Sequence, residues 1–348
     1  MWLRRIVGLA AGLAGGGVAL ARALRSRRFM DFSGRTVVIA GGSRGLGLVL
    51  ARHFAAEGAR VVLMARDEAE LARAQDDLAS RGAGVSTIVC DVRSRSDVDT
   101  AIARIVREHQ TIDVLVNNAG IIQVGPIVHM TPSDFEDAMA THFWGPLFVI
   151  LAALPHMRTR GARRIVNISS IGGKIAVPHL VPYSASKFAL TGLSEGLQAE
   201  LARDGFLVTT VCPGLMRTGS TYNARFKGRY RWEFAWFHLF DSLPGLSANA
   251  DAAAGKILEA CRYGDPELVI TPSARLAILL QAISPGGWAH AMALTNRLLP
   301  SPDRNSGTQS RSGWLSTSRI APSFLTMLSD RATIENGELP ASAAGLGV

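Results

Sequence analysis

The sequence predicts an α/β fold with a doubly wound parallel sheet. Short runs of β-branched residues alternate with longer segments of helical spacing from Phe32 onward. This alternation is typical of a parallel sheet that helices cover on both faces. A glycine-rich turn joins the first run to the first helical segment, and a hydrophobic content of 48% in 348 residues is enough for one large core. We therefore expect a single Rossmann-like domain between an N-terminal hydrophobic segment and a C-terminal extension.

Three regions follow from changes in composition along the chain. They are a hydrophobic segment over residues 1–29, the α/β domain over residues 30–300 and a tail over residues 301–348. Residues 300–313 are polar and linker-like. Residues 314–348 carry no pattern that predicts an element, so we expect the tail to be partly disordered.

The hydrophobic segment is an uncharged run between arginines. Arg4 and Arg5 precede the run 6–21, and four arginines follow it over residues 22–28. The run is shorter than the roughly 20 residues that a spanning helix needs, so we expect a membrane anchor or an interfacial helix. A cleaved signal peptide is the alternative. The excess of arginines after the run predicts a membrane-associated protein whose catalytic domain lies in the cytoplasm.

Charge and cysteine content exclude several classes of protein. A net charge of +9 is compatible with a soluble basic protein, an anionic membrane surface or nucleic acid. No nucleic-acid-binding motif is present, so we expect a membrane surface as partner and no nucleic acid. The cysteines, Cys90, Cys212 and Cys261, are widely spaced and form no C-x-x-C pair. This spacing argues against a disulfide framework and against a metal site.

The first predicted strand, 36–40, leads into a phosphate-binding turn. The turn reads Gly41-Gly42-Ser43-Arg44-Gly45-Leu46-Gly47, and a helical segment follows it. Glycines let backbone N–H groups approach a pyrophosphate, and the positive helix N-terminus adds to the attraction. The same turn matches the nucleophile elbow of hydrolases through Gly41, Ser43 and Gly45. An elbow serine normally follows several strands of its sheet, whereas this strand is the first.

The end of the second predicted strand, 60–65, indicates which dinucleotide binds. In dinucleotide folds an acidic residue here binds the ribose 2′-hydroxyl, while an arginine suits a 2′-phosphate. Arg66 follows this strand and Arg44 lies in the glycine turn. Two arginines near one phosphate favour NADP(H), and two ordinary surface arginines are the alternative.

The remaining elements continue the alternation. Further strands are expected at 85–90, 112–116, 165–169, 207–212 and 267–270, and helices at 68–81, from 132, at 248–262 and at 276–283.

Ser170, Tyr183 and Lys187 are the candidate catalytic residues. The Tyr-x-x-x-Lys pair opens a segment with leucines at three- and four-residue spacing, so both side chains should lie on one helix face. A lysine ammonium favours the phenolate and should lower the pKa of the tyrosine from about 10 toward the range of an acid/base catalyst. The Ser170 hydroxyl can bind a carbonyl oxygen. A solvated Tyr and Lys on a helix surface are the alternative.

These motifs together resemble the short-chain dehydrogenase/reductase family. The segment N-I-S-S ends at Ser170, Y-S-A-S-K runs from Tyr183 to Lys187, and the likeness extends over residues 32–272. The resemblance implies reduction of a ketone or oxidation of a secondary alcohol with NADP(H). In that chemistry Ser170 orients the substrate oxygen, Tyr183 exchanges the proton and Lys187 holds the nicotinamide ribose.

The resemblance also implies a set of cofactor-binding residues. They are Gly41, Ser43, Arg44, Gly45, Leu46 and Gly47 in the turn, Arg66, Asp91 and Val92 at the adenine, Asn118, Ala119 and Gly120 along the ribose, and Tyr183, Lys187, Pro213, Gly214 and Thr218.

Two positions depart from the family pattern. Ala40 stands where a threonine usually precedes the first glycine. His142 stands where the family has an asparagine that holds a water in a proton relay to the lysine. Imidazole can donate and accept, so His142 is a fourth catalytic candidate. A buried structural histidine is the alternative.

The segment 222–240 is expected to form a substrate lid, because it follows the P-G turn and is rich in aromatic residues with interleaved basic residues. An ordinary packed helix is the alternative. We therefore expect a large apolar pocket and a small hydrophobic substrate, such as a sterol, retinoid, long-chain acyl or sphingoid-like ketone. The mixture of aromatic and basic residues is also typical of a membrane-interface segment. A non-catalytic nucleotide sensor or scaffold is the alternative function, and the oligomeric state, including a homo-oligomer, stays open.

Overall fold

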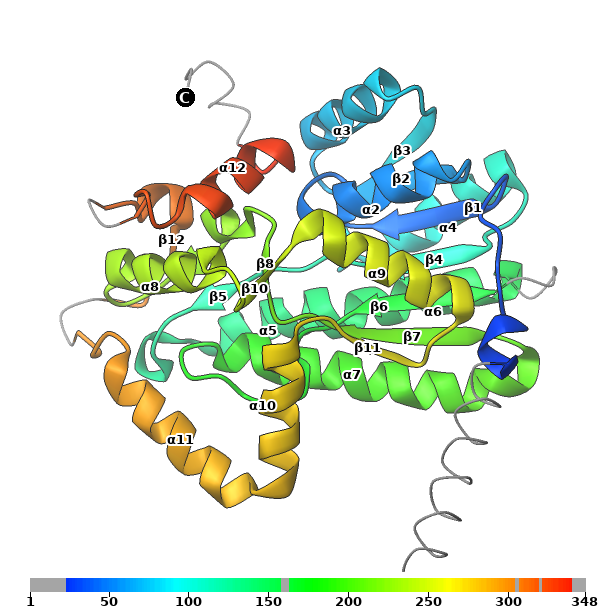
Figure 1. Ribbon diagram of the computed structural model, residues 1–348. Helices are drawn as coiled ribbons and strands as arrows, with labels where there is room; N and C mark the ends of the chain where they lie inside the picture. The colour runs from blue at the N-terminus through cyan, green and yellow to red at the C-terminus, as the bar shows by residue number, and fades with distance from the viewer. Residues whose placement is uncertain (1–22, 158–162, 304–306, 319–320, 340–348) are drawn as a thin grey trace, which may run out of the picture.

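The computed structural model describes residues 23–157, 163–303, 307–318 and 321–339 (Figure 1). The expected anchor, residues 6–21, lies outside the described residues.

A seven-stranded sheet forms the centre of the molecule, as expected. Its order is β11-β7-β6-β4-β1-β2-β3, and every pairing in it is parallel. The strands are β1 (Thr36–Ala40), β2 (Arg60–Ala65), β3 (Val85–Val89), β4 (Val114–Asn117), β6 (Arg164–Ile168), β7 (Leu207–Cys212) and β11 (Glu267–Val269). The strand order runs in opposite directions from β1, so the fold is doubly wound, and ligands in such folds bind where the order reverses.

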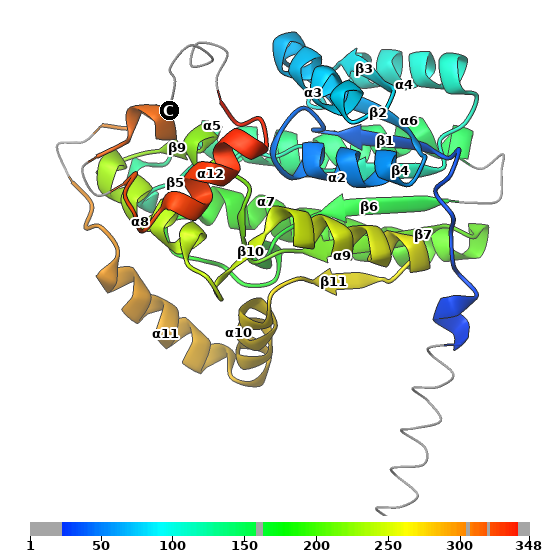
Figure 2. The same ribbon diagram turned by 45° about the horizontal axis from the view of Figure 1, so that its top comes forward.

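Helices cover both faces of the sheet, as Figures 1 and 2 show. One face packs against α2 (Gly45–Ala56), α3 (Glu68–Ser80) and α9 (Ala250–Tyr263). The other face packs against α4 (Arg95–His109), α6 (Gly145–Met157) and α7 (Val181–Leu201). The central strands are buried on both faces, which explains why they read as continuous β-branched runs rather than as alternating patterns.

Local signals set several helix ends. The Asp67 carboxylate caps α3 by accepting from the Glu70 amide at 2.9 Å. The Asn249 side chain caps α9, and Gly264 ends that helix with φ at 61° in the left-handed region. Thr131 and Asp134 form a capping box in front of α5 (Pro132–Met139).

Helix α5 continues through a π-helical turn, Ala140–Trp144, into α6. Among the described residues, this continuous helix is the one long and apolar enough to cross a membrane by length and composition. Its residues Val149, Ile150 and Ala153 are fully buried in the core. The apolar residues of this helix are therefore explained by its packing against the sheet.

Smaller elements complete the fold. They are β5 (Gln123–Val124), β8 (Leu215–Arg217), β9 (Arg225–Phe226), β10 (Ser247–Asn249), β12 (Arg311–Ser312), α8 (Tyr230–Ser242), α12 (Met327–Glu335) and short turns at Ile127–His129, Ile171–Gly173, Ala202–Asp204, Ser220–Asn223 and Gly313–Leu315. Strand β9 pairs with β5 and β12, and β8 pairs with β10.

The expected lid folds as α8 and its approach, and four of its eight aromatic side chains are buried. Tyr222, Phe226, Phe234 and Phe237 are buried together in one cluster. Their area is removed from water by packing on one another, so this segment does not present a broad aromatic face.

A pair of helices stands apart from the sheet. Helices α10 (Pro272–Ile283) and α11 (Pro285–Leu298) follow the edge strand β11 and form a V that projects from the domain (Figures 1 and 2). No side chain of α11 is fully buried.

The described part of the C-terminal tail is ordered against the domain, which differs from the expectation of disorder. Helix α12 packs on α8, and its Ser329, Ala332 and Thr333 are buried. The contacts between α12 and α8 join residues far apart in the chain, so no local sequence pattern predicts them.

Candidate active site

The candidate residues meet at the point where the strand order reverses. A cavity of about 400 Å³ opens at the carboxyl ends of β1, β4, β6 and β7. Its lining includes the following predicted site residues: Gly41, Arg44, Gly45, Leu46, Arg66, Asn118, Ala119, Gly120, His142, Ser170, Tyr183, Lys187, Pro213, Gly214 and Thr218. Distant segments of the sequence therefore form one site because parallel strands end at one edge.

The glycine turn has the geometry of a backbone cradle. Gly41 has φ at 80°, and a Cβ there would lie 2.6 Å from Ala119 Cα. A Cβ at Gly47 would overlap the Gly41 carbonyl. The Asn118 side chain donates to that carbonyl at 2.7 Å and ties the turn to the end of β4. These close approaches fit the requirement that a dinucleotide phosphate reach the backbone.

Ser170, Tyr183 and Lys187 lie together, with Ser170 and Lys187 buried and Tyr183 half-buried. The Ser170 hydroxyl bonds the Tyr183 side chain and also accepts from the Gly172 amide at 3.0 Å. Lys187 Nζ donates to the Ile168 carbonyl at 2.8 Å and lies 5.8 Å from the centroid of the Tyr183 ring. The three side chains thus occupy one wall of the cavity, with the tyrosine and lysine on the first turns of α7.

Burial governs the protonation of this cluster, and the expected pKa of the tyrosine is wrong in this structure. Burial raises the pKa of Tyr183, although the bond from Ser170 acts in the opposite direction. Burial also lowers the pKa of Lys187 to about 7. Because Lys187 loses its proton near neutral pH, it stabilises the phenolate only weakly. The expected lowering of the Tyr183 pKa therefore does not occur.

His142 lies in the π-helical turn, and protein groups engage both of its ring nitrogens. Its Nε2 accepts from the Ile121 amide at 3.1 Å, and its Nδ1 lies 2.7 Å from Ser186 Oγ. Since Nε2 accepts, the proton of the neutral ring lies on Nδ1, and Ser186 in turn donates to the Tyr183 carbonyl at 2.8 Å. Burial and the nearby Lys187 hold the pKa of His142 well below its usual range.

This arrangement leaves neither ring nitrogen of His142 free for a water molecule. The ring packs edge-on against Tyr183, with centroids 5.4 Å apart. The contacts favour a positioning role, in which His142 holds the first turn of α7 and the loop at Ile121, over the expected water-binding role. Single π-helical turns are often found at functional sites.

The two arginines differ in their surroundings. Arg66 is exposed and lines a second cavity, of about 60 Å³, together with Asp91 and Val92. Arg44 is engaged by carboxylates, because its Nε lies 3.2 Å from Glu70 and its Nη1 bonds Glu338. Asp91 pairs with Arg93 at 2.7 Å, which holds the pKa of Asp91 below its usual range.

Further polar residues complete the site. Ser43 is buried and donates to Glu70 at 2.9 Å. The Thr218 hydroxyl donates to Ser220 at 2.9 Å and lies on the cavity wall. Asn223 and Glu338 also line the cavity, and the sequence did not identify either. Glu338 lies in the tail, where no motif marks it, so only its contacts reveal it.

Comparisons with known proteins agree with this geometry. Residues 35–227 match the family described as short chain dehydrogenase. Dehydrogenase/reductase SDR family member 7B of Danio rerio is 37% identical over 292 residues, which cover 82% of this chain and 93% of that protein. The granaticin polyketide synthase putative ketoacyl reductase 1 of Streptomyces violaceoruber is 36% identical over 208 residues, covering 59% of this chain and 76% of that one.

Solved structures have the same fold. A short-chain dehydrogenase from Streptomyces avermitilis superposes with a TM-score of 0.66 at 29% identity, covering 77% of this chain and 99% of that chain. L-sorbose reductase from Gluconobacter frateurii, solved with NADPH and L-sorbose, has a TM-score of 0.62 at 26% identity, covering 70% and 97%.

Proposed function

The chain belongs to the short-chain dehydrogenase family and is an oxidoreductase acting on alcohol or ketone groups, and we propose that it reduces a hydrophobic ketone with NADPH. The observation that carries the proposal is that the buried Ser170 and Lys187 and the half-buried Tyr183 line the same cavity. The cofactor supplies the hydride, and the protein's own residues bind, orient and protonate the substrate.

The proton would pass through Tyr183. A ketone oxygen that receives a hydride becomes an alkoxide unless a proton reaches it, and a phenol within hydrogen-bonding reach can donate one. The raised pKa of Tyr183 keeps the phenol protonated at neutral pH, the form that reduction requires. Ser170 would orient the substrate oxygen beside that phenol. Lys187 would hold the nicotinamide ribose and, when protonated, restore the charge balance around Tyr183.

NADP(H) would be held by the glycine turn and the arginines. The glycines at 41 and 47 let the turn pack closely against Ala119 and against itself, and the backbone N–H groups of the turn would bind the phosphates. Arg44 and Arg66 both line the cavity and carry the positive charge that a 2′-phosphate needs. The structural neighbour solved with NADPH, L-sorbose reductase, is consistent with this choice for a protein of this fold.

The lining of the cavity supports an apolar substrate. Its lining includes the apolar residues Ile121, Ile122, Met216 and Ala224. Burial of apolar area at such a wall contributes about 25 cal/mol per Å², so a substrate with an extended hydrocarbon part would bind more tightly than a sugar of equal size.

Turnover with a panel of apolar ketones, followed by NADPH absorbance, tests the proposed function. Tyr183→Phe removes only a hydroxyl, so the affinity for NADPH should persist while turnover falls by about 10²–10⁴, the usual loss for an acid/base group. Tyr263→Phe is the matched control, because Tyr263 ends α9, packs on Phe29 and does not line the cavity, so this variant should keep the wild-type rate. A Tyr183→Phe enzyme with a wild-type rate would contradict the mechanism.

We also propose that the protein works at a membrane surface with its catalytic domain in the cytoplasm. Helices α10 and α11 expose apolar residues, namely Leu276, Leu279, Leu280, Ile283, Leu294 and Leu298. The sequence 272–298 contains Arg275 and Arg297 and no acidic residue. Apolar side chains with basic ones fit an anionic lipid surface.

The position of these helices supports the same surface. Arg25 pairs with Asp265 at 2.7 Å, just before the edge strand β11, and α10 begins just after that strand. The residues that follow the N-terminal apolar run therefore lie at the β11 edge of the sheet. The α10–α11 pair lies at the same edge. Figures 1 and 2 show both on the lower side of the molecule.

Sedimentation of the full-length protein with anionic vesicles tests this location. The protein should sediment with the vesicles, and Leu279→Glu combined with Leu294→Glu should weaken the association. Val89→Glu, on an exposed position of the opposite edge strand, is the control for an added charge. A protein that stays in the supernatant without detergent would overturn the proposed location.

A further inference from the structure

The C-terminal segment from Met327 to Glu338, which we call the strap, contacts the phosphate-binding turn directly. The amide of Gly45 donates to the Asn336 carbonyl at 2.8 Å. The Asn336 side chain donates to the Thr218 carbonyl at 3.3 Å. The strap therefore bridges two elements that the proposed function assigns to the cofactor, and it uses a backbone donor of the glycine turn to do so.

Glu338 places a carboxylate at the same turn. Its side chain is 3% exposed and bonds Arg44. Asn223 Nδ2 donates to the same carboxylate at 2.6 Å and to the Glu338 carbonyl at 2.9 Å. A Cβ added to Gly45 would collide with the Glu338 carboxylate. The carboxylate thus lies against the backbone of the turn, between a guanidinium and an amide donor, as a bound anion would.

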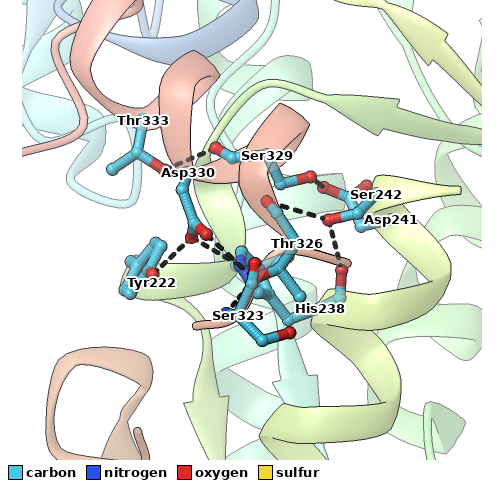
Figure 3. Close-up of polar contacts among 10 residues, drawn as sticks. Tyr222, His238, Asp241, Ser242, Ser323, Thr326, Ser329, Asp330 and Thr333 are labelled. Atoms are coloured by element: carbon cyan, nitrogen blue, oxygen red, sulfur yellow. Dashed lines mark hydrogen bonds and ion pairs between the residues drawn. The ribbon is translucent and has the colours of Figure 1, made fainter. Parts of the chain in front are cut away.

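A separate polar network anchors the strap on the lid helix α8. Figure 3 shows Asp330 facing Tyr222 and His238, which bond its carboxylate at 2.6 and 2.9 Å. Ser329 donates to Asp241 at 3.1 Å. These contacts hold α12 independently of Glu338. Gly337, with φ at 67°, separates the end of α12 from Glu338, so the carboxylate can move while the helix stays in place.

A cofactor phosphate and the Glu338 carboxylate cannot share these donors. Arg44 already faces two carboxylates, Glu70 and Glu338. A further anion beside them would meet like charges at short range in a site with little water, where the repulsion is strong. Binding of a phosphate at Arg44 therefore requires that Glu338 withdraw or lose its charge.

We propose that Glu338 competes with a phosphate of the dinucleotide for Arg44 and the glycine turn, so that the strap weakens cofactor binding until the carboxylate is displaced. The proposal rests on the proposed use of NADP(H). If the displaced contact belongs to the 2′-phosphate, which only NADP(H) carries, Glu338 is a determinant of cofactor choice. If it belongs to the pyrophosphate common to both dinucleotides, Glu338 weakens the binding of both.

Titration of full-length variants with nucleotides tests the competition. Glu338→Gln keeps the shape of the side chain and removes its charge, so it should bind NADPH about tenfold or more tightly than the wild type, as the competent fraction rises. Glu335→Gln is the matched control, because its carboxylate pairs with Arg331 at the surface and does not touch the turn. Asp330→Asn loosens the anchor with Glu338 intact and should shift NADPH affinity in the same direction.

Two smaller probes identify the phosphate. If Glu338→Gln binds adenosine 2′,5′-bisphosphate more tightly than the wild type and binds ADP with unchanged affinity, the carboxylate competes with the 2′-phosphate. If ADP tightens as well, it competes with the pyrophosphate. Unchanged or weaker binding of all four ligands, with NADH as the fourth, would overturn the proposal. If neither the wild type nor Glu338→Gln binds any dinucleotide, the proposed function itself fails, and the inference fails with it.

Hydrogen exchange gives an independent readout on the wild-type chain. Addition of NADPH should increase amide exchange over residues 336–338 if the strap end is displaced. Slower exchange there would mean that the strap closes over the bound cofactor, and this result would refute the competition.

Discussion

Replacing Lys187 by methionine should increase stability at neutral pH while it abolishes turnover. Lys187 is 4% exposed, and burial lowers its pKa to about 7. A lysine in the unfolded chain titrates near about 10.4 and each pH unit corresponds to 1.36 kcal/mol, so the buried ammonium costs about 4 kcal/mol at pH 7. Methionine has a similar length and carries no charge.

The sign of the effect follows from proton binding. Between about pH 7 and about pH 10.4 the unfolded chain holds the lysine proton and the native protein does not, so the free energy of unfolding of the wild type rises with pH. This rise is absent from Lys187→Met. The variant leaves the Ile168 carbonyl without its donor, a loss of about 1–3 kcal/mol that does not depend on pH. Lys187→Met should therefore be more stable than the wild type by about 1–3 kcal/mol at pH 7 and less stable by a similar amount near pH 10.5.

Urea unfolding followed by tryptophan fluorescence at several pH values measures this crossing. Other titrating groups contribute equally to both proteins and cancel in the difference. Lys256→Met, at an exposed position of α9, is the matched control and should run parallel to the wild type. A difference between Lys187→Met and the wild type that stays constant from pH 7 to pH 10 would refute the argument that burial depresses the charge of Lys187.

Three further outcomes are expected. Asp241→Asn should be more stable than the wild type above pH 7, by about 3–4 kcal/mol in the free energy of unfolding, and this difference should shrink toward pH 4. Burial raises the Asp241 pKa to about 7, so between about pH 4 and pH 7 the native protein binds more protons than the unfolded chain. His142→Leu should lower kcat with little change in KM, whereas His142→Asn should keep much of the activity; full activity in the leucine variant would limit His142 to a packing role. Arg66→Ala should weaken NADPH binding about 10- to 150-fold, from the 1.5–3 kcal/mol of a charge-assisted bond, and leave NADH nearly unchanged, and equal losses for both would exclude Arg66 as the reader of the 2′-phosphate.

Most of the fold could be predicted because its elements have local signals. The strands 36–40, 60–65 and 207–212 agree with the predicted bounds, since β-branched runs between turn residues depend only on neighbouring residues. The meeting of the glycine turn with Ser170 and Tyr183 could also be predicted, because parallel strands bring their carboxyl ends to one edge.

The functional predictions were less complete where the role of a residue depends on the residues that pack around it. His142 was recognised by its position, but its role depends on the Ile121 amide and Ser186, which only the structure places against its two nitrogens. The aromatic segment was predicted to line a pocket, whereas most of its rings pack on one another. The composition of a segment shows how much apolar surface it has. It does not show which other residues pack against that surface.

The sequence alone determined the strands of the parallel sheet, the glycine turn after the first strand and the kinds of chemical group at the candidate site. Tertiary structure decided how those groups behave. The pKa values of Tyr183 and Lys187 depend on burial, and the partner of Arg44 is a carboxylate 294 positions away in the chain. Local periodicity specifies elements because it acts over a few residues, whereas desolvation and charge pairing depend on every segment that the fold brings into contact.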